Sequence, residues 1–294
     1  MLTKTEQVQR SPVRLRWSDW LLFAGALIAV LPPMIEVARN NWSTEQGGHG
    51  PIVLATGLWL LVREYRDARG LQRPGNLALG LAALAVFLPA FILLGITGIL
   101  ELQVAAMYAA LIAGAYLLIG GRMLRAIWFP IFYLAFALPP PDTVVATLTN
   151  PVKIAISRAA VSLLHAFGFP VGSSGVVIQI AQYELLVAAA CSGLNSLITL
   201  SAIGLFYVYL RHRSDPKALI LMSLAVVPVA ILANFIRVLI LILLTYYVSE
   251  AAAQGFLHDF AGIVTFAAAL ATMMAIEAVY SRFVERKSRV PANG

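Results

Sequence analysis

Long apolar stretches recur along this chain with short charged segments between them, and the pattern restricts the chain to a helical, membrane-embedded fold. Of the 294 residues, 60% are apolar and 12% are charged, whereas soluble domains carry about 25% charged residues. We therefore predict an all-α polytopic membrane protein. No polar stretch is long enough for a separate soluble domain. We expect one membrane-embedded domain over residues 1–294, with a core at about 18–280 and basic tails at 1–17 and 281–294.

The apolar runs predict about eight transmembrane helices. Their approximate bounds are 20–37, 50–62, 77–94, 102–119, 126–138, 194–210, 218–248 and 262–280. The second and fifth are short for a hydrocarbon core of about 30 Å. The first run is too long for a signal-peptide core and no small-residue cleavage site follows it, so we interpret it as a spanning helix.

The basic residues are distributed unevenly between the two sides that this topology defines. Alternate connecting segments and the two tails hold 17 of the 21 lysine and arginine residues, and the opposite segments hold only Arg39, Lys153 and Arg158. The positive-inside rule then places both termini in the cytoplasm. The formal net charge of +7 therefore reflects membrane orientation, and we expect no nucleic-acid partner.

The longest segment outside the predicted spans runs from about Pro139 to Ala190. Residues 148–167 predict an amphipathic helix lying on the outer leaflet. Its apolar positions are Leu148, Val152, Ile156, Leu163 and Phe167. Residues 176–180 and 183–187, joined by Ala181 and Gln182, predict a short β-hairpin before the sixth span, although the turn lacks an Asn-Gly pair.

Cys191 is the single cysteine and lies where this outer segment meets the sixth span. A lone cysteine excludes an intramolecular disulfide and a multi-cysteine metal site. Ser192 and Gly193 follow it, and the start of a helix stabilises a thiolate through its dipole and exposed N–H groups. The sequence therefore allows a nucleophile here, or a small buried side chain.

Arg237 interrupts the otherwise uncharged apolar run Ala218–Val248. Burying a guanidinium in a bilayer costs about 2.5–3.5 kcal/mol on insertion scales. Counting along the helix places Arg237 about 28 Å from the inner edge of the run. It either snorkels to the outer headgroups or faces the bundle interior with a function. Asn234, three residues earlier, lies on the same helical face and is suited to orienting it.

His258 lies in the short outer segment before the last span, followed by Asp259. A histidine is the usual acid or base for a thiol nucleophile, although a solvated loop histidine is an alternative. Adjacent residues rarely face each other, so Asp259 is a weak orienting partner. The topology brings Cys191, Arg237 and His258 to one membrane face, which favours a cysteine acyl-transfer site.

These motifs resemble the exosortase/archaeosortase family. The resemblance rests on residues 190–194 (Ala-Cys-Ser-Gly-Leu), residues 234–237 (Asn-Phe-Ile-Arg), and His258-Asp259 with Gly262. His49-Gly50, Phe129-Pro130 and the prolines at 139–141 also look like family features. Two positions depart from the pattern of many relatives. Those relatives have an acidic residue two positions before the cysteine, where this chain has Ala189, and a basic residue four positions after it, where this chain has Asn195.

The resemblance implies a multi-pass cysteine transpeptidase that cleaves C-terminal PEP-CTERM-type sorting signals of exported proteins. It implies catalytic roles for Cys191, Arg237 and His258, with Ser192, Gly193, Asn234 and Asp259 in support, and no metal or cofactor. The expected location is the bacterial inner membrane, with the active site on the periplasmic face. The expected partners are the bilayer, exported proteins with a sorting signal and an anchoring helix, and an acceptor nucleophile.

Two non-enzymatic alternatives fit the composition. One is a small-solute permease with Arg237 as counter-ion, and the other is a structural subunit of an exopolysaccharide assembly machine. A permease predicts polar residues throughout the membrane depth, whereas most polar groups here gather at one face. The enzyme is the favoured interpretation.

Overall fold

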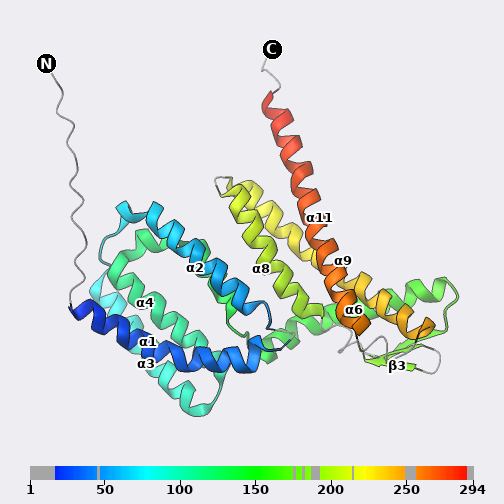
Figure 1. The fold of residues 1–294 in the computed structure, drawn as a ribbon, viewed down its shortest axis with the longest axis horizontal. Helices are drawn as coiled ribbons and strands as arrows, with labels where there is room; N and C mark the ends of the chain where they lie inside the picture. Colours follow the sequence, from blue (N-terminus) through cyan, green and yellow to red (C-terminus); the bar gives the residue numbers. More distant parts are fainter. Residues whose placement is uncertain are drawn as a thin grey trace.

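The computed structural model describes residues 17–44, 47–174, 177–180, 183–186, 193–213, 215–248 and 256–289, and it is predominantly helical (Figure 1). The α-helices of the described residues are α1 (Trp17–Val37), α2 (Gly50–Asp67), α3 (Leu77–Thr97), α4 (Leu100–Ala126), α5 (Trp128–Leu134), α6 (Asp142–Ala166), α8 (Gly193–His212), α9 (Pro216–Tyr247) and α11 (Phe256–Arg289). Short helical turns cover Ala38–Trp42 (η1), Arg69–Leu71 (η2) and Ala135–Ala137 (η3).

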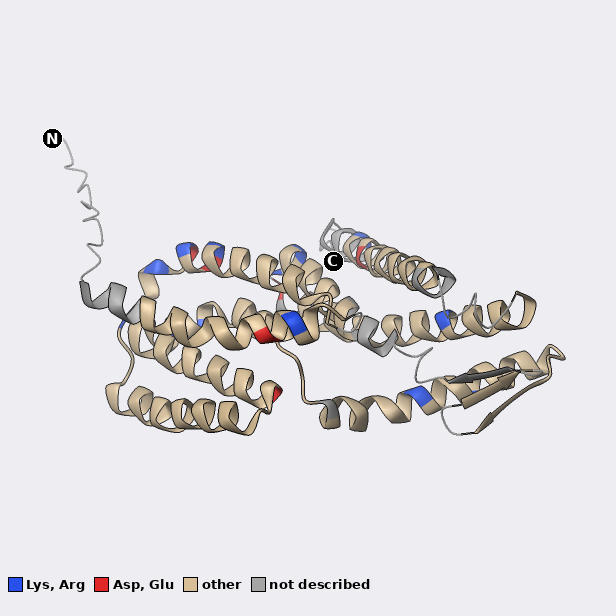
Figure 2. Ribbon diagram, turned by 60° about the horizontal axis from the view of Figure 1, so that its bottom comes forward, with Lys and Arg blue, Asp and Glu red and all other residues tan. Residues whose placement is uncertain are grey.

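Each of the eight predicted spans contains a helix. Within the described part of the chain, four helical segments are long and apolar enough to cross a membrane: Leu77–Thr97, Leu100–Ala126, Lys217–Tyr247 and Phe260–Arg282. Long stretches of these helices carry no charged residue (Figure 2). The chain is therefore an integral membrane protein. Helix α11 continues to Arg289, so the predicted basic tail begins as helix.

Local sequence signals explain where the membrane helices begin. Asn76 precedes α3, and its Oδ1 accepts a hydrogen bond from the Leu79 amide at 3.1 Å. Asp215 precedes α9, and its Oδ1 accepts from the amides of Lys217 at 3.0 Å and Ala218 at 3.2 Å. Pro216 supplies a first helical residue that needs no amide partner.

Gly120 breaks α4 near its end. Its φ of +75° and ψ of 168° are non-helical, and a side chain there would collide with the carbonyl oxygen of Arg73. Only glycine adopts this conformation at low cost. The continuous part of α4 therefore ends close to residue 119, as the predicted fourth span does, and a new helical direction starts beyond it.

The fifth predicted span, 126–138, is not one continuous helix. The backbone leaves helical geometry at Ile127, where φ is −103° and ψ is 25°. The apolar helical segment that follows is Trp128–Ala137. Ten residues of helix cover about 15 Å, half of a hydrocarbon core. This segment is therefore too short to cross a bilayer by itself.

The predicted hairpin is confirmed. Strand β2 (Val177–Ile180) pairs antiparallel with β3 (Tyr183–Leu186), with Ile180 opposite Tyr183. A third strand, β1 (Val171–Ser174), which the sequence patterns did not indicate, pairs antiparallel with the other edge of β2.

The predicted helix at 148–167 is α6, and it begins six residues earlier, at Asp142. Its apolar positions do not form one uniform face, because Ile156 is buried while Leu148 and Phe167 are exposed.

The helices form two groups that meet at α8. Helices α1 to α4 lie on one side, and α8, α9 and α11 lie on the other (Figure 1). An apolar cluster of α2, α5 and α8 joins the groups. At its centre the rings of Phe129 and Tyr209 stack with centroids 3.7 Å apart. A second cluster packs α8, α9 and α11 together around Met222, Val226 and Met273.

Buried carboxylates join the elements at one end of the α8–α9–α11 group. Glu64 on α2 is buried and pairs with Arg213 in the α8–α9 turn at 2.5 Å. Glu277 on α11 is buried and contacts Arg211 at 3.5 Å and His212 at 3.3 Å. We call this the Glu277 end. The contact between α2 and the α8–α9 turn agrees with the charge pattern, which assigned both to the same side of the membrane.

Candidate functional site

Arg237 is buried, with 7% of its surface exposed. It lies ten residues before the last residue of α9, which is about 15 Å along the helix. The guanidinium is therefore directed toward the protein interior rather than toward surrounding lipid. Of the two interpretations of this arginine, burial favours the bundle-interior one over snorkelling.

Gly262 on α11 provides the surface against which the guanidinium packs. A Cβ placed on Gly262 would lie 3.4 Å from both Cζ and Nη2 of Arg237. This is van der Waals distance, so the planar guanidinium of Arg237 lies against the backbone of α11 at Gly262. A larger side chain at position 262 would occupy the space that the guanidinium fills. The small residue in α11 thus allows the charged group of α9 to fit between the two helices.

Asn234 lies one helical turn before Arg237 and is also buried, at 4% exposure. The prediction that the two share a helical face fits this joint burial. Buried amides and guanidinium groups supply several hydrogen-bond donors in fixed positions. Two such side chains on adjacent turns therefore form a polar site within an apolar helix pair.

An apolar cluster covers the neighbourhood of Arg237 from one side. It joins α6, β2, α9 and α11 through buried residues that include Val238, Leu241 and Ala261, which are close in sequence to Arg237 and Gly262. Strand β3 also packs against α9. The hairpin thus lies against the part of α9 that carries the arginine.

Three of the predicted site residues on the other segments, Gly193, His258 and Asp259, lie near the same end of the helix group. Helices α8 and α11 begin, and α9 ends, on the side where α6 and β3 lie (Figure 1). Gly193 is the first residue of α8. His258 and Asp259 are in the first turn of α11, and His258 is four positions, one turn, before Gly262. We call this the Arg237 end. Cys191 and Ser192 lie outside the described residues.

The comparison with protein families identifies a match that covers most of the chain. Residues 42–275 match the model of the transmembrane exosortase family. The chain belongs to this family. The match includes the segments that carry Cys191, Arg237 and His258. No curated protein and no solved structure matches the chain. Exosortases are membrane cysteine transpeptidases, so family membership agrees with an integral membrane protein and suggests sorting-signal processing.

Other residues that the exosortase resemblance pointed to come together near the start of α2. His49 Nε2 lies 3.2 Å from the carbonyl oxygen of Phe136, and Trp42 Nε1 donates to the carbonyl of Ala137 at 2.9 Å. A side chain at Gly50 would collide with the indole of Trp42. These contacts attach the C-terminal end of η3 to the start of α2. They therefore fix the position at which the chain enters the proline segment 139–141, which precedes α6.

The buried carboxylates were missed by the sequence patterns. Glu277 is a carboxylate inside an apolar run, the same signal that marked Arg237, and its partners Arg211 and His212 follow the sixth predicted span. Tyr207 also donates to Glu277 at 3.1 Å. Among the described residues, no group of three or more His, Cys, Asp or Glu is arranged to hold a metal ion.

Proposed function

We propose that the chain is a membrane cysteine transpeptidase that cleaves PEP-CTERM-type C-terminal sorting signals from exported proteins. The proposed arrangement has about eight membrane-embedded segments, both termini in the cytoplasm, and a site on the periplasmic face of the inner membrane. The burial of Arg237 against Gly262, one turn from His258, carries the proposal. The costly placement of a cation at this depth calls for a chemical role, and the family supplies one.

The proposed reaction uses Cys191 as nucleophile. Its thiolate attacks the scissile carbonyl carbon, a sulfur–carbon bond forms, and the carbonyl oxygen becomes an oxyanion. Collapse of this tetrahedral intermediate breaks the carbon–nitrogen bond. The new amine of the released C-terminal tail takes a proton from His258, and the upstream protein stays on Cys191 as a thioester.

Arg237 is assigned to the oxyanion. In this role the guanidinium supplies positive charge and N–H donors to the developing negative charge, and a donor of this kind contributes about 10²–10³ in rate. Asn234 is assigned as its positioning residue. An acceptor amine or water then attacks the thioester carbonyl, gives up its proton to His258, and releases the thiolate.

Removal of the nucleophile tests the proposal. In cells that co-express an exported reporter with a PEP-CTERM-type tail, the Cys191→Ala and Cys191→Ser variants should accumulate in the membrane and leave the reporter uncleaved. Ser201→Ala, a similarly small change within α8, is the matched control and should process normally. Full processing by Cys191→Ala would overturn the nucleophile assignment.

A further inference from the structure

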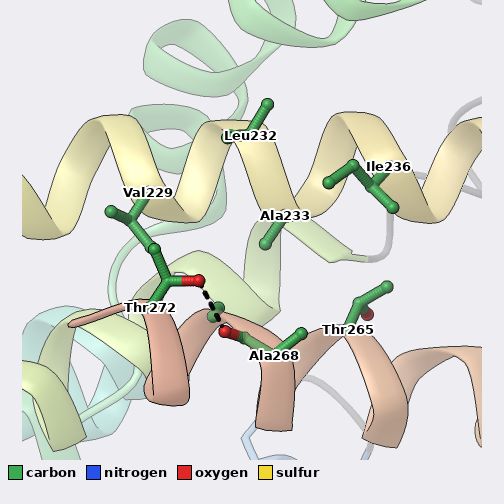
Figure 3. A pocket seen from close by; sticks show the side chains of 8 residues that line it. Val229, Leu232, Ala233, Ile236, Thr265, Ala268 and Thr272 are labelled. Carbon is green, nitrogen blue, oxygen red and sulfur yellow. Dashed lines mark hydrogen bonds between the residues drawn. The ribbon is translucent and has the colours of Figure 1, made fainter. Parts of the chain in front are cut away.

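A groove runs between α9 and α11 beside the Arg237 site. Figure 3 shows it bordered by Val229, Ala233 and Ile236 on α9 and by Thr265, Ala268 and Thr272 on α11. It contains about 320 Å³ of empty space up to its open side. We propose that this groove holds the apolar membrane helix that follows the sorting signal of the substrate. The proposal rests on the proposed function and adds a binding place to it.

The first observation is the surroundings of the groove. Both helices that border it belong to segments long and apolar enough to cross a membrane. Leu232 and Ile236 at its rim are 54% and 43% exposed. The hydroxyl of Thr272 donates to the carbonyl of Ala268 at 2.8 Å, as Figure 3 shows, and that of Thr265 donates to Ala261 at 2.7 Å. Both hydroxyls are satisfied within α11, so the groove offers an apolar surface to an occupant in the bilayer.

The second observation is the size of the bordering side chains. Three of the residues that line the groove are alanines: Ala233, Ala268 and Ala269. Helices in membranes associate where small residues allow close backbone approach, because apolar burial gives little advantage over lipid there. The groove extends over eight residues of each helix, which is a rise of about 10 Å or two turns. The small bordering residues favour a helix over an acyl chain as the occupant.

The third observation is the continuity of the groove with the proposed site. Ala233 is one turn before Arg237, and Thr265 is three residues after Gly262, so one end of the groove lies next to the guanidinium. A substrate helix seated there would leave the groove at the level of Arg237. The peptide that precedes the helix, which carries the sorting signal, would then pass the guanidinium.

Disulfide crosslinking tests the docking place without needing catalysis. The Cys191→Ala background removes the single native cysteine. In it, Ala268→Cys lies in the groove, and Ala267→Cys lies on the exposed surface beside it. The probe is the exported reporter with a PEP-CTERM-type tail and single cysteines at successive positions of its apolar helix. Oxidation should crosslink Ala268→Cys to probe positions spaced by three or four residues, and Ala267→Cys should crosslink at least about ten-fold less. Equal crosslinking at both positions, or none at Ala268→Cys, overturns the proposal.

A second arm measures processing in the protein that retains Cys191. Ala268→Phe should fill the groove and slow reporter cleavage about ten-fold, while Ala267→Phe should leave it unchanged. Unchanged cleavage by Ala268→Phe would show that the groove holds only lipid. If the wild-type chain fails to cleave the reporter, the proposed function fails; periodic crosslinking at Ala268→Cys would still support the docking place.

Discussion

The buried charged side chains at the two ends of the α8–α9–α11 group have different surroundings. At the Glu277 end, buried carboxylates meet basic side chains from neighbouring elements: Glu277 meets Arg211, and Glu64 meets Arg213. At the Arg237 end, a buried guanidinium packs against a glycine of the adjacent helix. Ion pairs that join elements stabilise an arrangement. Arg237 lies toward the end where α8 and α11 begin, and the chain belongs to a family of membrane transpeptidases, so the comparison suggests a structural end and a chemical end.

Arg237→Lys gives the largest expected effect. A lysine keeps the charge but cannot reproduce the planar, forked donors of the guanidinium, so reporter processing should fall about 100-fold or more. Arg211→Lys at the Glu277 end is the matched control. Arg211 is 59% exposed, so its pair contributes little and processing should stay near the wild-type rate. Similar losses in both variants, measured as initial rates per membrane-inserted molecule, would remove the distinction between the ends.

Substitutions at Gly262 should have a graded, intermediate effect. Gly262→Ala adds a Cβ at 3.4 Å from the guanidinium, an ordinary contact, and should keep most activity. Gly262→Val adds two further methyl groups on that Cβ and should displace the Arg237 guanidinium. The processing rate should then fall about 10–100-fold, because small misplacements of a catalytic group are costly. Initial processing rates of the two variants check this. Equal activity would show that the position of the guanidinium against α11 does not matter.

Variants of the Glu64–Arg213 pair should have the smallest effect on chemistry and a measurable effect on stability. Arg213→Ala leaves the buried carboxylate of Glu64 without its cation and should cost about 1–3 kcal/mol. Glu64→Ala leaves Arg213, which is 41% exposed, and should cost less. Thermal unfolding in detergent would show the order, and the reverse order would contradict a structural role for this pair.

The pH dependence of the Arg213→Ala variant provides a further check. Burial raises the pKa of the Glu64 carboxyl above 4.5, while Arg213 opposes the increase. Removing Arg213 should raise this pKa further. The folded variant then binds a proton more tightly than the unfolded chain, so its stability should be retained near pH 4.5 and fall as the pH rises through the higher folded pKa. A loss that is constant from pH 4.5 to 8 would argue against this explanation.

The sequence predicted the fold well where a single element carries the signal. Apolar runs located the helices, and the strand pattern located the β2–β3 hairpin. The β1 strand and the interrupted helix near Ile127 were missed, because pairing and backbone breaks depend on neighbouring elements. Arg237 was recognisable because a charge in an apolar run is costly. The contact of Arg237 with Gly262 could not be predicted, since it depends on how α9 and α11 pack. Glu277 was missed because it lies close in sequence to the charged residues of the C-terminal tail.

The mass of an acyl-enzyme tests the central claim most directly. After acid quench of the protein reacting with a reporter that carries a PEP-CTERM-type tail, peptide mass spectrometry should find the upstream part of the reporter, without its C-terminal tail, joined to Cys191. Hydroxylamine should release it, as expected for a thioester. A cleaved reporter with unmodified Cys191 throughout the time course, or an adduct on a different residue, would contradict the account.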